Sequence, residues 1–414
     1  MTCSGRVVVT GMGVVSPLGN SVSAFWEGLL AGRSGIGPLT RCSTEGQRCR
    51  IAGQVRDFDI TAYLSEKEAR RLDPFCHYAL AAATEAVRQA GLAGGGVVPE
   101  RAGVIVSSGV GGLASMQDSV RTLVERGAGR LSPLTVPIMI ADMASGMLSI
   151  HFGFSGPNLA VVTACASATH SIGEACWMIR RGDADVMLAG GSEAGLVEVG
   201  LGGFASMKAL STRNDDPEHA SRPFDRDRDG FVPAEGAGVL VLESLEHARA
   251  RQAEILAEVV GYGLSGDAYH ITAPDPEGRG AARCIRNALA QAGAAPEDLS
   301  YVNAHGTSTP LNDRMETGAL KSALGPAAYR IPVSSTKSMT GHALGAAGGL
   351  ESVACIQALR QQVIPGTMNY QTPDPDCDLD YVPNACRQIP VDLALNVSFG
   401  FGGHNAALLF RKAP

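Results

Sequence analysis

Residues 78–112 read YALAAATEAVRQAGLAGGGVVPERAGVIVSSGVGG, and residues 281–309 repeat the same order of elements as AARCIRNALAQAGAAPEDLSYVNAHGTST. Each segment begins with an amphipathic helical pattern that stops at an Ala-Gly pair. A turn with Pro-Glu follows, and then an apolar strand. A helix and a strand that recur in the same order predict that the chain contains two related halves.

A second pair of segments supports the duplication. Residues 161–183 and 333–362 each begin as a short strand, pass through small residues and continue as a long helix. Five apolar runs, RVVVTGM, AGVIVSS, ADVMLAG, GAGVLVLES and NAALLFR, are typical of strands buried on both faces. We therefore predict an α/β fold with five layers, α/β/α/β/α, built from halves 1–252 and 253–414. The active site is expected between the halves, at strand ends and helix N-termini.

The composition limits the possible functions. The chain of 414 residues is 45% hydrophobic and 18% charged, which is typical of a globular protein. Its net charge of −7 argues against a protein that binds nucleic acid or an anionic membrane. The ten cysteines form no C-x-x-C pair and no zinc framework, and the N-terminus shows no signal peptide. These features predict reduced thiols in a cytoplasmic protein.

Three stretches invite other interpretations. Residues 143–173 contain no Asp, Glu, Lys or Arg, but GFSGPN interrupts them, so we expect a buried core or a subunit contact rather than a membrane span. Residues 200–233 have turn chemistry and little periodicity, and we expect an ordered surface segment that covers the site. Within them, FDRDRDG resembles a calcium loop, but its twelfth position is Gly236, so an Arg–Asp ladder is favoured and no metal is predicted. GMGVVSP lacks the third glycine of a dinucleotide site.

Cys165 lies in VVTACASATH, residues 161–170, where a strand is expected to give way to a helix. Free N–H groups and the positive end of the helix dipole would lower the pKa of a thiol there. The same N–H groups could bind an oxyanion that develops on a substrate attached to the sulfur. The alternative is an inert buried cysteine.

Two histidines favour the catalytic interpretation. His305 follows a strand and precedes a polar turn and a helix that opens near Asn312. His342 begins a small-residue helix, five residues after Lys337. If the halves pack about their repeat symmetry, both histidines converge on Cys165.

The segments TACAS, NAHGTSTPLND, STKSMTGHALGAAGG and SFGFGGHN resemble the active-site motifs of the condensing enzymes. The resemblance covers nearly the whole chain. It is strongest to β-ketoacyl-acyl carrier protein synthase II and the ketosynthase subunits of type II polyketide systems, and it implies the thiolase fold and an acyltransferase activity. It implies that Cys165 carries the acyl chain, that His305 and His342 donate to the malonyl thioester oxygen, and that Lys337 organises the histidines.

The resemblance extends to further residues and to the partner. It implies a supporting network of Glu316, Glu351 and Phe401, with the N–H groups of Cys165 and Phe401 as an oxyanion site and Phe401 as a gate. It implies substrate contacts at Thr307, Thr309, Val110, Phe204 and Phe399. Substrates would arrive on the phosphopantetheine arm of an acidic acyl carrier protein, so no other cofactor is expected. The carrier would contact Lys67, Arg70, Arg71, Arg130, Lys208 and Arg213.

Two departures and several alternatives remain. Asp142 stands where the family usually has asparagine at a dimer interface, and Val110 stands where a larger aliphatic residue often meets the acyl chain. A chain-length-factor subunit, the non-catalytic alternative, would lack the nucleophilic cysteine. A thiolase proper would carry a second C-terminal cysteine, and an initiating synthase would replace His342 by asparagine. Fatty-acid and polyketide or polyene substrates stay open, as do a homodimer and a heterodimer with a chain-length factor.

Overall fold

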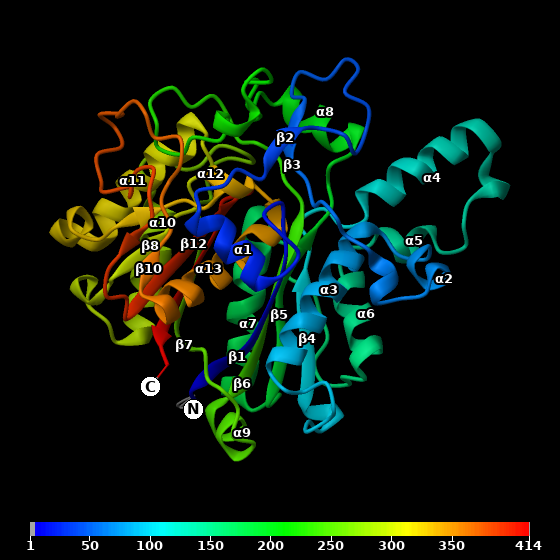
Figure 1. Cartoon of the computed structure of the whole chain (residues 1–414), viewed down its shortest axis with the longest axis horizontal. Coiled ribbons are helices and arrows are strands. Elements are labelled where there is room, and N and C mark those ends of the chain that lie inside the picture. The colour runs from blue at the N-terminus through cyan, green and yellow to red at the C-terminus, as the bar shows by residue number, and fades with distance from the viewer. Residues whose placement is uncertain (1–4, 414) are drawn as a thin grey trace.

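The computed structural model describes residues 5–413, and its centre is a sheet of nine strands in the order β4-β5-β6-β1-β7-β13-β12-β8-β9 (Figure 1). The strands of this sheet are β1 (Val7–Val15), β4 (Ala102–Ser107), β5 (Val186–Glu193), β6 (Gly236–Ser244), β7 (Ala257–Gly266), β8 (Tyr301–Asn303), β9 (Val333–Ser334), β12 (Leu393–Gly400) and β13 (His404–Lys412). Two small antiparallel pairs complete the strands: β2 (Ile36–Pro38) with β3 (Ile51–Gly53), and β10 (Val363–Ile364) with β11 (Arg387–Gln388).

The strand order shows the duplication. From the centre outward, the first half runs β1, β6, β5, β4 and the second runs β7, β13, β12, β8. The directions also match, because in each half the first three strands pair antiparallel and the fourth lies parallel to the third. The halves join where β1 and β7 pair, over Val7–Val9.

The predicted strand in residues 161–163 is wrong. In the second half β9 lies parallel to β8, whereas in the first half the matching position beside β4 is occupied by extended chain with a single bridge, between Asn158 and Val104. The backbone N–H of Val161 donates to the side chain of Ser107 (2.8 Å) instead of to a strand carbonyl. A side chain on the neighbouring strand thus replaces the ladder.

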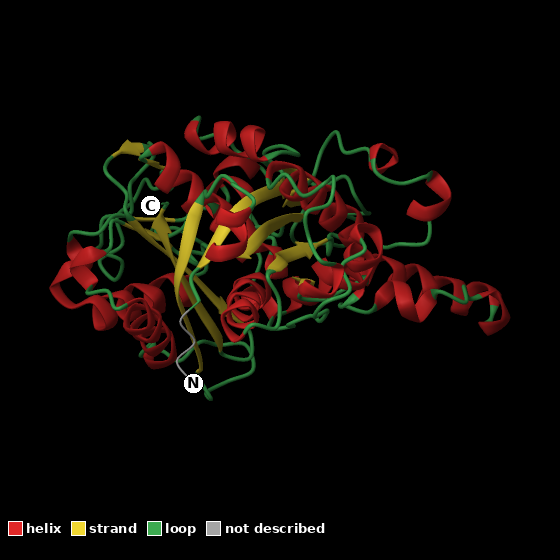
Figure 2. Cartoon of the chain, turned by 90° about the horizontal axis from the view of Figure 1, so that it is seen from below, coloured by secondary structure: helices red, strands yellow, loops and turns green. Residues whose placement is uncertain are grey.

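The helices form the other layers. Their bounds are α1 (Val22–Leu30), α2 (Glu66–Ala69), α3 (Pro74–Gln89), α4 (Leu113–Arg126), α5 (Thr135–Met139), α6 (Met143–Phe152), α7 (Ser167–Arg181), α8 (Glu198–Ser206), α9 (Leu245–Ala250), α10 (Arg279–Ala292), α11 (Pro310–Leu324), α12 (Lys337–Thr340) and α13 (Ala347–Gln361). Helices α3 and α10 cover the outer faces of the first and second half, while α7 and α13 pack together between them (Figures 1 and 2). Every residue of α13 from Ala347 to Leu359 is buried, as expected of a central helix. The five-layered prediction is confirmed.

A Gly-x-Gly pair on the first strand of each half brings the outer helix close to the sheet. On β1, a Cβ added at Gly13 would lie 1.8 Å from the carbonyl oxygen of Ala82 in α3. On β7, a Cβ added at Gly263 would lie 2.0 Å from the carbonyl oxygen of Cys284 in α10. The motifs GMG and GYG are therefore packing features, because any side chain at these positions would push the helix off the strand.

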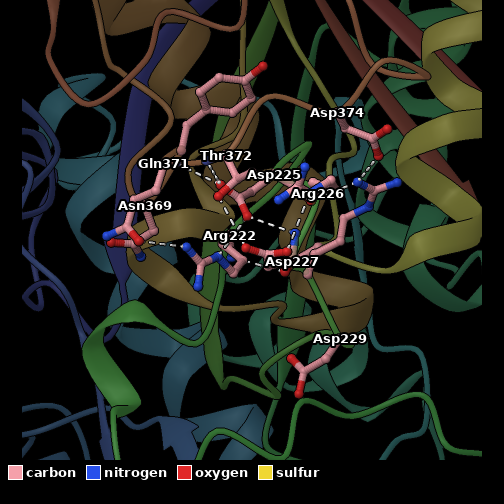
Figure 3. A network of polar contacts seen from close by, with 12 residues as sticks. Arg222, Asp225, Arg226, Asp227, Asp229, Asn369, Gln371, Thr372 and Asp374 are labelled. Carbon is pink, nitrogen blue, oxygen red and sulfur yellow. Dashed lines mark hydrogen bonds and ion pairs between the residues drawn. The ribbon is translucent and has the colours of Figure 1, made fainter.

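Residues 200–233 begin with the last turns of α8, which ends at Ser206. The remainder is held by the predicted Arg–Asp ladder (Figure 3). Buried Asp225 pairs with Arg222 (3.1 Å) and accepts the backbone N–H groups of residues 371 and 372, while Arg228 binds Asp374 (2.6 Å). The ladder therefore ties this segment to residues 369–374 with charge-assisted bonds. No helix within residues 5–413 is both long and apolar enough to span a bilayer.

Candidate active site

Two matching turns form the base of the site. Ala164–Ala166 makes a 3-10 turn before α7, and Leu344–Ala346 makes the same turn before α13. Each begins at a non-glycine residue in the left-handed region, with φ of 50° at Ala164 and 45° at Leu344. Such conformations are strained and persist only where packing enforces them. The two turns contact each other, so the site lies where the halves meet.

Cys165 lies in the first of these turns and is only 6% exposed. Burial raises the pKa of its thiol to about 12, although the ammonium of Lys337 acts in the opposite direction. The predicted lowering of this pKa is therefore wrong, because the loss of solvent outweighs the ammonium of Lys337 and the nearby N–H groups of Phe401 and Cys165. The backbone N–H groups of Cys165 and Phe401 both lie near enough to the sulfur to lower the pKa of the thiol, and their role as an oxyanion site stays a prediction.

His305 and His342 come from the second half and complete the group. Both are 2% exposed, their ring centroids lie 5.3 Å apart, and one nitrogen of each ring lies within 4.8 Å of the other and of Cys165 Sγ. Burial, with a further contribution from Lys337, holds the pKa of both imidazoles well below the usual value. Both rings are therefore neutral at pH 7, and each carries one N–H donor and one free nitrogen.

Lys337 fixes the orientation of His305. Its ammonium donates to the carboxylate of Glu351 and to the carbonyl oxygen of His305 (2.6 Å), and it lies 3.5 Å from His305 Nδ1. This leaves Nε2 as the nitrogen of His305 available to the cavity. Because Lys337 and Glu351 are both buried, each neutralises the other in a place that water does not reach.

Two further buried carboxylates hold backbone around the site. Glu316, predicted from the sequence, accepts the N–H groups of His305 and Gly306 (2.7 Å each), and burial raises its pKa to about 8. Sequence reasoning missed Glu193, which accepts the N–H groups of Gly109 (2.8 Å) and Gly345 (2.9 Å) and so bridges the two halves. The available signal was an acid within the apolar run VMLAGGSEAGL.

A cavity of about 340 Å³ opens from Cys165, His305 and His342. Other predicted residues on its wall are Thr307, Thr309, Phe399, Phe401 and Lys208. The hydroxyl oxygens of Thr307 and Thr309 lie 2.9 Å apart, where they can bind an amide-containing arm.

Two predicted substrate residues are not on the cavity wall. Val110 is 42% exposed and lies away from the cavity. Phe204 lies behind the wall, with its ring centroid 5.5 Å from that of Phe231 and 6.5 Å from that of Phe401. Neither side chain therefore contributes to the cavity wall, although Phe204 packs against the apolar cluster that contains Cys165.

Two glycines follow Phe401 in its segment. Gly402 and Gly403 have φ of 84° and 74°, which suits glycine, and the N–H of Gly402 donates to the carbonyl of Ile271 (2.8 Å). Phe401 also lies on the cavity wall beside the thiol. The predicted role of Phe401 as a gate stays a prediction.

The predicted carrier-protein residues lie at the surface but not in one cluster. Lys67 and Arg70 lie on or beside α2, where Arg70 pairs with Glu66 (2.8 Å). Lys208 is exposed at the cavity wall, and half-buried Arg213 donates to the carbonyl of Asp227. The remaining residues, Arg71 and Arg130, are exposed.

Known proteins share this fold and site. Residues 4–248 match the family described as Beta-ketoacyl synthase, N-terminal domain, and residues 256–371 match Beta-ketoacyl synthase, C-terminal domain. The chain is 53% identical over 407 residues to 3-oxoacyl-(acyl-carrier-protein) synthase 2 of Synechocystis sp., with 98% of each chain covered.

Solved structures of ketosynthases have the same fold as this chain. The chain superposes with a TM-score of 0.91 on a type II PKS ketosynthase in complex with its acyl-carrier protein, at 38% identity, with 99% of this chain and 100% of that chain covered. It superposes with a TM-score of 0.93 on the ishigamide ketosynthase/chain length factor, at 37% identity and the same coverage. Together with the five layers, the paired turns and the Cys165–His305–His342 group, these matches establish that the chain belongs to the β-ketoacyl synthase family and has the thiolase fold.

Proposed function

We propose that the protein is an elongating 3-oxoacyl-(acyl-carrier-protein) synthase of fatty-acid or type II polyketide biosynthesis. It joins an acyl chain to malonyl-carrier protein by a decarboxylative Claisen condensation. The observation that carries the proposal is the convergence of Cys165 with two neutral histidines at the inner end of an open cavity. The similarity to 3-oxoacyl-(acyl-carrier-protein) synthase 2 supports it.

In the first half-reaction, the sulfur of Cys165 attacks the thioester of an acyl-carrier protein. The N–H groups of Cys165 and Phe401 stabilise the oxyanion, and the carrier thiol leaves. Because burial keeps the thiol protonated, its proton has to leave as the C–S bond forms. The departing carrier thiolate takes up this proton, so that the thiol proton of Cys165 leaves with the carrier.

In the second half-reaction, the malonyl thioester loses carbon dioxide and negative charge develops on its carbonyl oxygen. His305 and His342 donate to that oxygen, which a neutral imidazole can do in a buried site. The carbanion attacks the acyl carbonyl on Cys165 and expels the thiolate, which takes up a proton. The product is two carbons longer and leaves on the carrier protein.

The proposal includes the partners and the compartment. The pantetheine arm would enter past Thr307 and Thr309, and the exposed basic residues would receive an acidic carrier. No other cofactor is needed. Exposed apolar side chains on α4, around α5 and on α6 (Val124 80%, Val136 61%, Ile150 75%) support a dimer, and the exposed Asp142 lies among them. The second subunit is either a copy of this chain or a chain-length factor, and the compartment is the cytoplasm.

The competing function is that of a chain-length-factor subunit without a nucleophile. The presence of Cys165, His305 and His342 in one group speaks against it.

Intact-mass analysis tests the proposal. The protein is incubated with a panel of acyl-carrier proteins, beside Cys165→Ala and the matched control Cys386→Ala, which removes an exposed thiol. We expect a mass increase equal to the acyl group in the wild type and in Cys386→Ala, and none in Cys165→Ala. Acylation of Cys165→Ala, or none by any donor, contradicts a stand-alone synthase. The preferred donor separates fatty-acid from polyketide substrates.

A further inference from the structure

The group that performs the condensation has a second chemical property. Within residues 5–413, Cys165, His305 and His342 form the one group of buried side chains that offers three metal-ligating atoms within 4.8 Å of one another. We propose that the unacylated site binds one soft divalent metal ion, Zn²⁺ or Cd²⁺, through Cys165 Sγ and one nitrogen of each histidine. The bound ion competes with acyl transfer. This inference goes beyond the proposed function.

The donor set fits such an ion. Zinc prefers thiolate and imidazole ligands in a tetrahedral arrangement, with ligands at about 2.0–2.3 Å from the metal. Ligand atoms around one ion are then separated by about 3.5 Å. The three atoms of the site therefore have to approach each other by up to about 1.3 Å. We expect rotation of the Cys165 side chain and small ring movements to supply this distance.

Each histidine can offer one ring nitrogen to the ion. A neutral imidazole binds a metal through the nitrogen that carries no proton. His305 turns Nδ1 toward Lys337, which fixes Nε2 as its ligand atom. His342 Nδ1 has no hydrogen-bond partner within the described chain, so the ring is free to adjust. The thiol of Cys165 has to lose its proton, so one proton is released for each ion bound.

The surrounding charges and space allow a divalent ion. The ammonium of Lys337 would repel it, but Glu351 pairs with that ammonium. The Cys165 thiolate and Glu193, which lies close enough to influence the thiol, add negative charge on the other side. The adjoining cavity of about 340 Å³ leaves room for a water molecule as fourth ligand.

Competition with acyl transfer follows from the same sulfur. An acylated Cys165 is a thioester, whose sulfur is no longer a thiolate and does not bind zinc well. A metal-bound Cys165 in turn has neither a free sulfur nor free histidines for the first half-reaction. Acylation and metal binding therefore exclude each other.

Zn²⁺ titration by calorimetry and Co²⁺ titration by absorbance test the proposal. Both are done in the Cys386→Ala background, so that the exposed thiol does not contribute. We expect one Zn²⁺ per chain, release of one proton, and a thiolate-to-Co²⁺ charge-transfer band. Cys165→Ala and His342→Ala are expected to weaken binding by at least tenfold, and acyl-loaded protein should bind as weakly as Cys165→Ala.

Alkylation of Cys165 provides a second test that does not depend on the folding of a variant. The Cys386→Ala protein is alkylated at Cys165, which leaves the chain unchanged and removes the thiolate. Retention of full Zn²⁺ affinity by the alkylated protein, or no binding before alkylation, overturns the proposal. Failure of the metal proposal can be told apart from failure of the proposed function. Metal binding is measured without any acyl donor, and acyl transfer is measured by mass without metal.

Discussion

Lys337 and Glu351 form an ion pair 14 residues apart in sequence, and both side chains are at most 3% exposed. The lysine begins α12 and the glutamate lies within α13, so the pair joins the short helix before His342 to the central helix after it. The pair also places the ammonium against His305.

Lys337→Met is expected to lower the free energy of unfolding by about 3–5 kcal/mol, because it leaves the Glu351 carboxylate buried without a partner. The double variant Lys337→Met/Glu351→Leu should regain most of this loss. Urea unfolding of both proteins measures the difference. If the double variant is no more stable than the single one, the unpaired charge is not the cause.

The reactivity of Cys165 should rise throughout the accessible pH range. Because burial raises its pKa to about 12, the thiolate fraction grows about tenfold per pH unit from pH 7 to pH 10. The rate of iodoacetamide alkylation, followed by mass in the Cys386→Ala background, should grow in proportion. A plateau below pH 9 would show that the helix N-terminus outweighs burial after all.

Acidification should destabilise the fold through the two histidines. Below pH 6.5 the unfolded chain takes up a proton on each of them, whereas the folded chain does so only at much lower pH. The free energy of unfolding therefore falls as the pH drops, by up to about 1.4 kcal/mol per pH unit for each histidine.

The opposing effect of Glu316 has to be removed from this measurement. Its folded pKa of about 8 stabilises the fold as the pH drops from 8 toward 4.5, so a single protein shows only the sum. The comparison is with His305→Asn/His342→Asn, which retains Glu316. Equal slopes of stability against pH for both proteins would rule out the histidines.

The Gly-x-Gly pair predicts a large difference between two glycine substitutions. Gly13→Ala places a Cβ 1.8 Å from a carbonyl oxygen of α3 and should cost about 3 kcal/mol, the upper end of the usual range for overpacking. Gly318→Ala, on the exposed side of α11 with no atom nearby, should instead stabilise by about 1 kcal/mol. Thermal unfolding compares them, and equal effects would contradict the close approach.

The sequence predicted the features that repeat or that depend on local pattern. The halves, the outer helices and the strand that precedes His305 follow from periodicity and from recurring segments. The failures depend on contacts between distant residues. Ser107 takes the hydrogen bond that would have made residues 161–163 a strand. The pKa of Cys165 is set by what covers it, and Glu193 reaches Gly345 across 152 residues of sequence. None of these contacts produces a periodic pattern in the amino-acid sequence, so the sequence does not predict them.

The two strained turns explain why only one half of the molecule carries the nucleophile. Where the first turn presents Cys165, the second presents Gly345, and a Cβ there would lie 2.2 Å from the backbone nitrogen of Gly109. Any thiol at that corner would collide with the main chain of the other half. Duplication supplied two equivalent corners, but steric exclusion permits only one to be a nucleophile. Two halves of the same architecture therefore have different roles: the first carries the nucleophile and the second does not.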